Sequence, residues 1–448
     1  MSGLQGADVA ELRQLASKMR TAGQKLEGQR HSFSACIAGT SWPGPDGDRF
    51  RQDWRADHSR TLGAAALFLK QAADELVRHA NEQETASAGS GGSLAGGARP
   101  GVQASVPGPG DVMGKSAAEV RTWWLGLTAS QQRAFVQKYP TVAGNTNGIP
   151  FAARIEANRA NAQSRIDWLK NHDPEPRFNP LLMDISYPAR YAKEHEAWQV
   201  RQEKGLEYFQ QVVAGEVQLA AYDPAANSIV ELIGNFDEET STVLTYVPGT
   251  LTNEASFYSG GGAQDMAKYL VSNTGSTAAF VYKGTEFPDG GPEAFLVEAR
   301  EEYFVDATAP VLRDFQAAVD VEKPDDAQTV GIGHSWGARN LTGSEAAGAH
   351  YDKVLALSGA AIPTGWTPDP HTEYFAYSYP DLLLSAELAG AVGANYPMKE
   401  PAFDKYFYAP PGGVEWGDMV SMENHSLITS IGPENEMAMR DIRKEISR

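Results

Sequence analysis

Ser335 is the residue whose neighbours in the sequence most strongly suggest covalent chemistry. It lies in Gly333-His334-Ser335-Trp336-Gly337, a Gly-x-Ser-x-Gly pattern. A serine hydroxyl is a weak nucleophile, and it needs a base within hydrogen-bonding reach and a carboxylate that orients the base. The two glycines allow a sharp turn between a strand and a helix, where a Cβ would clash. We therefore predict that Ser335 is a nucleophile, against the alternative of a chance Gly/Ser-rich turn.

One later histidine has the position expected of the base. In strand–turn–helix elbows of this kind the chain order is serine, acid, histidine. Three histidines follow Ser335, namely His350, His371 and His425. His350 follows the elbow too soon, and His371 precedes the strand expected to carry the acid. His425 is expected in a loop after the last strand, and we predict that it is the base.

Asp381 is the predicted acid of the same set. It lies in Tyr379-Pro380-Asp381, just past the second strand that follows the elbow, where a carboxylate would orient the histidine. Asp404 and Asp418 remain alternatives.

The oxyanion hole requires two backbone N–H donors. Trp336, directly after the nucleophile, is predicted to supply one. The other is assigned to Thr250, in the turn Pro248-Gly249-Thr250 that follows an apolar strand, with Leu251 as the next choice. Proline cannot donate a hydrogen bond, whereas glycine lets the turn approach the nucleophile closely.

Short apolar and β-branched runs alternate with helical segments in the second half of the chain. This alternation predicts parallel crossovers and a doubly wound, mostly parallel sheet, hence an α/β class and an α/β-hydrolase core over residues 213–448. The first two strands form an expected edge hairpin. The predicted strands are 217–222, 228–233, 242–247, 278–282, 327–332, 353–359, 373–378 and 403–408.

The N-terminal region is predicted to be an all-α hairpin, residues 1–88. Two amphipathic helical patterns flank the breaker Trp42-Pro43-Gly44. This arrangement resembles the WXG helical hairpins exported by type VII secretion systems, which implies export by that route and a small helical partner protein. His79-x-x-x-Gln83 stands where the family has its Tyr-x-x-x-Asp/Glu export signal. An ordinary dimerisation hairpin is the alternative. Residues 89–112 read as a flexible Gly/Ser/Pro linker.

Residues 113–212 are predicted to form a helical lead-in to the core. Their spaced motifs resemble those of an actinobacterial α/β-hydrolase family once catalogued as a domain of unknown function. That resemblance implies the same Pro-Gly-Thr turn, elbow, acid and late histidine, with Trp336 where the family often has tyrosine. We interpret Arg154 and Arg159 as helix-surface ion-pairing residues. The motifs are Trp123-Trp124, Gly144-Asn145, Gly148-Ile149-Pro150, Arg154 and Asn158-Arg159.

Composition narrows the function classes. The 448 residues carry 38 Lys plus Arg against 57 Asp plus Glu, a net charge of −19, which argues against nucleic-acid partners. The single cysteine, Cys36, excludes an intramolecular disulfide. We expect no metal and no organic cofactor, no transmembrane segment, and no ordinary signal peptide.

The chemistry and the resemblance together predict a secreted or cell-envelope serine hydrolase of the esterase or lipase type, acting on small-molecule or lipid esters. A secreted phospholipase effector or toxin, and a non-catalytic binding module on a hydrolase scaffold, are the alternatives. A group of late aromatic residues is expected to be mostly core, with loops that form a lid or an acyl pocket. Its members are Trp366, Tyr374, Phe375, Tyr377, Tyr379, Tyr396, Phe403, Tyr406, Phe407 and Tyr408.

Overall fold

The structure, a computed structural model, describes most of the chain after residue 106. The described ranges are 107–171, 187–258, 262–288, 302–388, 395–410, 413 and 421–447, and before them only Arg20, Arg30 and Ser34. The predicted hairpin at 1–88, nearly all of the linker at 89–112, and the alternative acid Asp418 therefore lie outside the described residues. The chain divides into two units, and nearly all described residues belong to the second, Ala104–Arg448.

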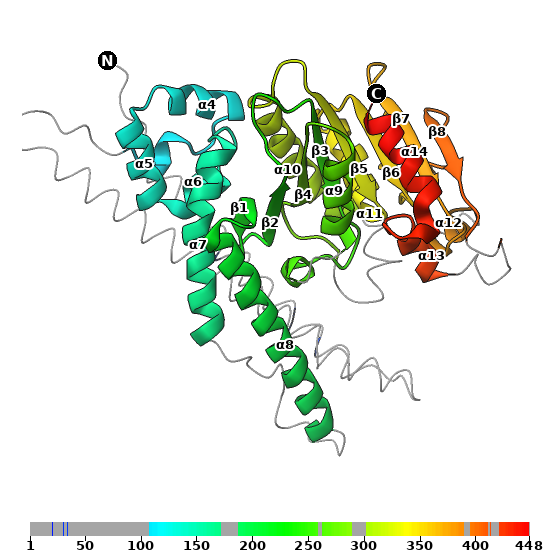
Figure 1. The fold of residues 1–448 in the computed structure, drawn as a ribbon, viewed down its shortest axis with the longest axis horizontal. Coiled ribbons are helices and arrows are strands. Elements are labelled where there is room, and N and C mark those ends of the chain that lie inside the picture. The colour runs from blue at the N-terminus through cyan, green and yellow to red at the C-terminus, as the bar shows by residue number, and fades with distance from the viewer. Residues whose placement is uncertain are drawn as a thin grey trace, which may run out of the picture. The chain divides into compact units, whose positions relative to one another are not determined.

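Eight strands of the described chain form one sheet (Figure 1). Their order is β1-β2-β4-β3-β5-β6-β7-β8. β2 runs antiparallel to β1 and β4, and all other neighbouring pairs are parallel. This order, with β2 as the antiparallel strand, is that of an α/β-hydrolase, so the predicted fold class is confirmed. The strands are β1 (Gln218–Asp223), β2 (Ser228–Ile233), β3 (Thr242–Val247), β4 (Thr277–Lys283), β5 (Gln328–His334), β6 (Lys353–Leu357), β7 (Glu373–Ser378) and β8 (Phe403–Phe407).

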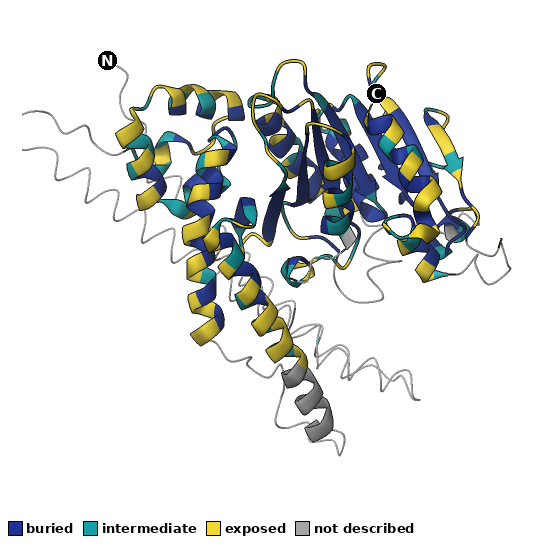
Figure 2. Ribbon diagram, viewed as in Figure 1, coloured by how far each residue is buried: buried dark blue, intermediate teal, exposed yellow. Residues whose placement is uncertain are grey.

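The strands lie where apolar, β-branched residues are densest. Every residue of β3, β4 and β6 is buried, as expected for parallel strands that are covered on both faces. Figure 2 shows the same continuous burial across the middle of the sheet. β2, β3 and β7 have the predicted bounds, and the edge hairpin of β1 and β2 is confirmed.

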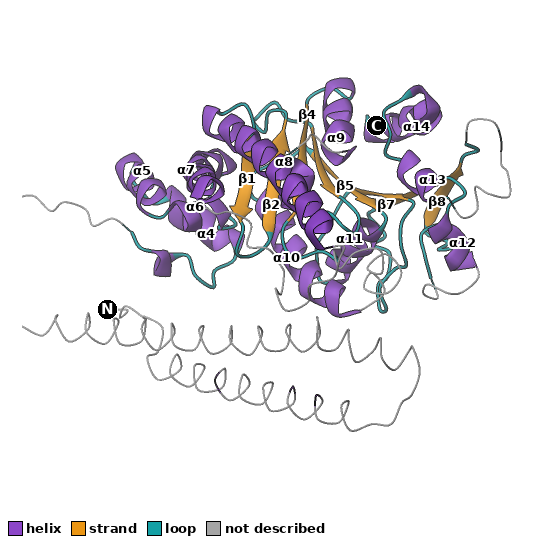
Figure 3. Ribbon diagram, turned by 90° about the horizontal axis from the view of Figure 1, so that it is seen from below, coloured by secondary structure: helices purple, strands orange, loops and turns teal. Residues whose placement is uncertain are grey.

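Helices cover both faces of the sheet, as Figure 3 shows. One face packs against α8 (Tyr187–Ala214), α9 (Gly262–Asn273) and α14 (Glu436–Ile446), through side chains such as Phe209, Met266 and Ile442. The other face packs against α10 (Glu302–Asp320) and α11 (Trp336–Ala346), through side chains such as Leu312 and Leu341. Within the described part of the chain, no helix has both the length and the apolar character needed to cross a bilayer.

The lead-in is helical, as predicted. It contains α4 (Ala117–Leu125), α5 (Ala129–Lys138), α6 (Pro140–Asn145) and α7 (Phe151–Asn171) before α8. Ser116 and Thr128 begin α4 and α5 as N-caps, because each side chain accepts the N–H of the third helical residue. A short 3-10 turn, η2 (Pro109–Asp111), and the buried Val112 belong to this folded part, although the sequence placed them in the linker.

Arg154 corrects one expectation about the lead-in. Its side chain is 1% exposed rather than on the helix surface. The guanidinium donates to the Gly144 carbonyl and to Asn147 Oδ1, and lies 4.8 Å from the centre of the Phe151 ring. Burial lowers the pKa of Arg154 to about 10. Arg154 therefore ties α7 to the turn after α6, and only Arg159 is exposed as expected.

Candidate active site

Ser335 occupies a strained turn between β5 and α11. Its φ is +54° and its ψ is −124°, a backbone conformation that side-chain-bearing residues rarely adopt. The turn is held by two backbone hydrogen bonds, from Ser335 N–H to the Leu357 carbonyl and from Ala360 N–H to the Ser335 carbonyl, each 2.9 Å long. Strain that the surrounding structure maintains in this way places the serine above the carboxyl ends of the strands.

Three glycines are required for this turn. A Cβ on Gly333 would lie 2.5 Å from the backbone of Ala338, and one on Gly337 would lie 2.0 Å from the Val247 carbonyl oxygen. A Cβ on Gly249, in the turn after β3, would lie 3.0 Å from Ser335 Cβ. The glycines of the elbow motif thus serve the close approach of α11 to β3 and β5, as the sequence indicated.

His425 and Asp381 form a buried pair. His425 Nδ1 lies 3.1 Å from Asp381 Oδ2, and the side chains are 3% and 1% exposed. Asp381 Oδ1 accepts the Leu384 N–H at 2.8 Å at the start of α12 (Leu382–Leu388). Asn424 Nδ2 donates to the Pro380 carbonyl at 3.1 Å, which fixes the residue beside the histidine to the residue beside the acid. These two hydrogen bonds hold the His425–Asp381 pair in one orientation.

His425 lies in a helix, and not in the predicted loop. The helix α13 (Met422–Leu427) begins after Ser421, whose side chain accepts the Asn424 N–H. The sequence of this segment gave little helical signal because the helix is six residues long. Its consequence for the site is that His425 is carried by a capped element rather than by irregular backbone.

Ser335 and His425 line the same pocket. Its volume is about 380 Å³, and it lies above β3, β4 and β5. None of the described residues lining it belongs to the late aromatic group that the sequence offered as an acyl pocket. The lining residues are Tyr246, Pro248, Gly249, Thr250, Leu251, Thr252, Ser256, Phe257, Ala263, Gln264, Val281, His334, Ser335, Met422, His425, Ser426 and Thr429.

The late aromatic residues lie mainly inside the protein instead. Tyr377 and Tyr379 are at most 2% exposed and belong to the core between the sheet and α14. Phe407 is 54% exposed on the last strand. The expectation of a core role is met for most of the group, because alternate residues on β7 and β8 face the two helical layers. The loops expected to form a lid or an acyl pocket fall partly outside the described residues, so that role stays a prediction.

The turn after β3 carries Thr250, the residue predicted to give the second amide of an oxyanion hole. Thr250 lines the pocket together with Ser335. Leu251, the second choice, donates its N–H to the Pro288 carbonyl at 2.8 Å, so its N–H is already used. Among the hydrogen bonds between described residues, none uses the N–H of Thr250 or of Trp336.

His334 is a site residue whose role the sequence did not reveal. Its Nε2 lies 3.1 Å from the His425 carbonyl oxygen, and the two imidazole rings are 5.0 Å apart. Burial, and then the neighbouring His425, lower the pKa of His334 to about 3. The ring is therefore neutral at physiological pH, and because Nε2 faces a carbonyl oxygen, the proton is on Nε2.

Glu387 is a second residue near the site whose role the sequence did not reveal. It lies on α12, is 4% exposed, and belongs to the same helix whose N-terminus holds Asp381. Burial, and then the charge of Asp381, raise the pKa of Glu387 to about 9. Its carboxyl group therefore keeps a proton at neutral pH.

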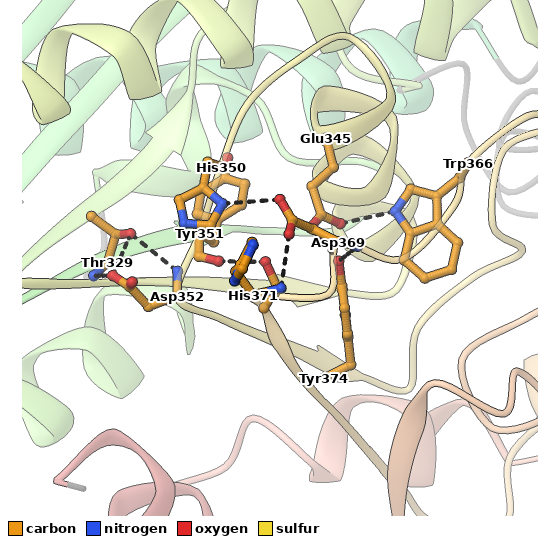
Figure 4. A network of polar contacts seen from close by, with 10 residues as sticks. Thr329, Glu345, His350, Tyr351, Asp352, Trp366, Asp369, His371 and Tyr374 are labelled. Carbon is orange, nitrogen blue, oxygen red and sulfur yellow. Dashed lines mark hydrogen bonds and ion pairs between the residues drawn. The ribbon is translucent and has the colours of Figure 1, made fainter.

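The other residues considered as the base or the acid lie away from the Ser335 pocket. His350 Nδ1 is 3.3 Å from Asp369 Oδ2, and the His371 N–H donates to Asp369 Oδ1 at 2.8 Å. Figure 4 shows this network beside the starts of β6 and β7, at the amino ends of the strands. Asp404 is exposed on β8. Of the described candidates, only Asp381 contacts His425.

Comparisons with known proteins agree with this description in a limited way. No protein-family model matches the chain. Two uncharacterized proteins of Mycobacterium tuberculosis, from different strains, are 31% identical over 150 residues. That match covers 31% of this chain and 22% of each relative, so the chain spans only a small part of these relatives.

Solved structures with a similar chain path are esterases and hydrolases. A carboxylesterase from Mesorhizobium loti matches 52% of this chain and 98% of its own, with 12% identity and a TM-score of 0.34. A serine hydrolase homologue from Coxiella burnetii matches 52% and 95%, with 13% identity and a TM-score of 0.29. An esterase from Mycobacterium marinum matches 60% and 95%, with 12% identity and a TM-score of 0.30. The fold assignment rests on the strand order, not on these values.

Proposed function

We propose that this protein is a serine hydrolase that cleaves carboxylic esters, of the esterase or lipase type. The observation that carries the proposal is a single pocket. It is lined by Ser335 on its strained turn and by His425, whose Nδ1 contacts the buried Asp381. A nucleophile, a base and an orienting carboxylate are the three groups that acyl transfer requires.

Each group has a role in the reaction. Ser335 Oγ attacks the ester carbonyl carbon while His425 Nε2 takes the hydroxyl proton. The Thr250 and Trp336 N–H groups donate to the oxyanion that forms. His425 then gives its proton to the departing alcohol oxygen, which leaves an acyl group on Ser335. A water molecule, deprotonated by His425, hydrolyses this acyl-enzyme. Asp381 holds the proton on His425 Nδ1, which leaves Nε2 to accept the serine proton.

The lining of the pocket favours an apolar acyl group. Tyr246, Phe257, Val281 and Met422 supply apolar surface beside Ser335, and burial of each methylene group contributes about 0.8 kcal/mol. The volume of about 380 Å³ is at the small end of ligand pockets. Short and medium acyl chains are therefore the expected substrates.

Hydrolysis of p-nitrophenyl esters with two to ten acyl carbons tests the proposal. We expect turnover by the wild-type protein and a loss of at least about 10⁴-fold in kcat for Ser335→Ala. Equal rates for the two proteins would contradict the proposal. Absence of turnover by a folded wild-type protein would favour the binding-module alternative, and turnover confined to phospholipid vesicles would favour the phospholipase alternative.

The N-terminal hairpin supports a second, separate proposal about location. The Trp42-Pro43-Gly44 breaker between two amphipathic patterns is the feature that suggests export by a type VII system with a small helical partner. We expect such a partner to complete a four-helix bundle with residues 1–88. Co-purification of the full chain with candidate partners, compared with a chain lacking residues 1–88, tests this; equal recovery would contradict it.

A further inference from the structure

A second pocket lies beside the active-site pocket on the same face of the sheet. Its volume is about 400 Å³. It is formed by α8, β2, the 3-10 turn η3 (Glu254–Phe257) and α9. The proposed reaction does not use it. Its lining residues are Lys204, Glu207, Tyr208, Gln211, Val217, Glu231, Phe257, Tyr258, Gln264 and Lys268.

The strand register makes the floors of the two pockets continuous. Val281 of β4 pairs with Tyr246 of β3 and with Glu231 of β2, so the three side chains point to one face in a row across the sheet. Tyr246 and Val281 line the active-site pocket, and Glu231 lines the second. Adjacent strands are about 4.8 Å apart, so the Glu231 backbone lies about 10 Å from that of Tyr246.

The partition between the two pockets is thin. Phe257 and Gln264 line both of them. Gln264 Nε2 donates to the Phe257 carbonyl at 3.0 Å and to Glu231 Oε2 at 2.9 Å. Phe257 and the Gln264 amide therefore stand between the space beside Ser335 and the space above Glu231. A substrate with two differently shaped parts can occupy both spaces with its scissile bond at Ser335.

Glu231 gives the second pocket a hydrogen-bonding floor. The residue is 4% exposed, and Oε2 accepts from Tyr208 Oη and Gln264 Nε2, both at 2.9 Å. Its hydrogen-bond partners among the described residues are therefore uncharged. Burial of the carboxyl group raises the pKa of Glu231, and this effect outweighs the two hydrogen bonds and the nearby positive charge of Lys268, which lower it. Such a group suits a ligand whose hydroxyls can both donate and accept.

The charges at the pocket argue against an ionic ligand. Lys204 and Lys268 line it together with Glu207 and Glu231. The lysines oppose an organic cation, and the glutamates oppose an anion. The rings of Tyr208 and Tyr258, with centres 5.8 Å apart, add apolar faces of the kind that pack against C–H groups. A neutral ligand with many hydroxyls fits both features.

We propose that this second pocket binds an uncharged, hydroxyl-rich group, a sugar or polyol, which is the alcohol side of the ester cleaved at Ser335. The acyl group occupies the apolar pocket. When the ester bond breaks, the alcohol oxygen takes its proton from His425 and the free sugar or polyol leaves from the second pocket. This inference rests on the proposed esterase function for the catalytic step, but not for the binding of the hydroxylated group.

Binding is tested first in the full chain carrying Ser335→Ala, which needs no catalysis. We expect saturation-transfer NMR to show methyl α-glucopyranoside bound, and to show weaker or no binding of tetramethylammonium and of methyl phosphate. Adding Tyr208→Phe should weaken glucoside binding about fivefold or more, because it removes one hydroxyl that lines the pocket and orients Glu231. Tyr222→Phe is the matched control, because Tyr222 Oη also donates to a glutamate, Glu254, yet lines neither pocket.

Three results would overturn the inference. They are no glucoside binding, tighter binding of either ion, and equal weakening by Tyr208→Phe and Tyr222→Phe. The first would leave the proposed esterase function untouched if p-nitrophenyl esters are still hydrolysed. The two proposals can therefore fail separately.

The alcohol-side assignment is tested by a ratio of rates in the protein with Ser335 intact. We expect kcat/KM for a glucose monohexanoate, divided by that for p-nitrophenyl hexanoate, to fall about tenfold in Glu231→Leu and in Tyr208→Phe. The ratio should stay at the wild-type value in Tyr222→Phe. An unchanged ratio in both pocket variants would overturn the assignment and would leave Glu231 as a tether between α8 and the sheet.

Discussion

Two His–Asp pairs, one at the carboxyl ends of the strands and one at the amino ends, show what separates a candidate reactive site from a surface contact. His425 and Asp381 are 3.1 Å apart with side chains 3% and 1% exposed. His350 and Asp369 are 3.3 Å apart with side chains 49% and 39% exposed. The pairs have the same chemistry and almost the same distance. They differ in burial and in the end of the strands at which they lie.

The end of the strands at which each pair lies determines which residues surround it. The carboxyl ends of the strands carry the turn of Ser335 and the loop of Thr250, and both residues line one pocket with His425 there. Ligand sites of open α/β sheets lie at the carboxyl ends of the strands. The amino ends carry the His350 network, which Figure 4 shows together with Glu345, Trp366 and Tyr374. Those contacts hold α11 to the segment before β7.

The largest expected difference comes from neutralising one aspartate of each pair. We predict that Asp381→Asn lowers kcat for p-nitrophenyl esters by about 10² to 10⁴-fold, because the amide no longer fixes the tautomer and orientation of His425. The matched variant Asp369→Asn should stay within about twofold of wild type, because surface ion pairs contribute at most about 1 kcal/mol. Steady-state rates and circular dichroism of both variants check this. Similar losses in the two would remove the distinction between the pairs.

A smaller effect is expected at His334, whose hydrogen bond to the buried pair is with the His425 carbonyl oxygen. His334→Leu should lower kcat about tenfold, because the His425 carbonyl loses its hydrogen-bond donor. His334→Gln should recover most of that loss, since its side-chain amide places a donor near the position of Nε2. The pH dependence of kcat reports the apparent pKa of the base, and it should shift in the leucine variant more than in the glutamine variant. Equal behaviour of the two variants would assign His334 a packing role.

The smallest expected effect concerns stability and compares two glutamates, the buried Glu387 and the half-buried Glu345, one in each region. Burial raises the pKa of Glu387, near Asp381, to about 9, and that of Glu345, in the His350 network, to about 7. The folded state then keeps a proton that the unfolded chain releases above the ordinary pKa. Stability therefore falls as pH rises from about 4.5 towards the raised value.

Replacing each glutamate by glutamine removes this dependence. We predict that Glu387→Gln stabilises the protein more at pH 8.5 than at pH 5. The difference in the free energy of unfolding should be about 1–3 kcal/mol. For Glu345→Gln the gain should be smaller and complete by about pH 7, and the Trp366 and Tyr374 hydrogen bonds to Glu345 offset it further. Urea unfolding at the two pH values measures both. A gain for Glu387→Gln that is independent of pH would contradict the assignment of a bound proton.

Much of the fold could be predicted from the sequence because local pattern fixes each strand. β2, β3 and β7 are continuous runs of strand-forming residues between turn residues, and the Gly-x-Ser-x-Gly pattern locates the elbow. The order of acid and histidine follows from the topology. Asp381 was therefore predictable, and its contact with His425 is what the structure adds.

Other features depend on contacts between distant segments. The ring of His334 meets His425 only because α13 returns over the end of β5. Glu387 is buried by tertiary packing, although the sequence around it reads as an ordinary amphipathic turn. Glu231 lies inside a strand of apolar residues, and its partners Tyr208 and Gln264 are 23 and 33 residues away. Arg154 was misread for the same reason, since a charged residue on a helix is usually exposed.

Labelling of the intact protein with a fluorophosphonate, followed by mass spectrometry of its peptides, tests the central claim most directly. Such a probe reacts with a serine only when a neighbouring base activates the hydroxyl. We predict one stoichiometric adduct, on the peptide containing Ser335, which is lost in His425→Ala and retained in His350→Ala. An unlabelled Ser335 in folded protein, or labelling that is indifferent to His425, would contradict the account.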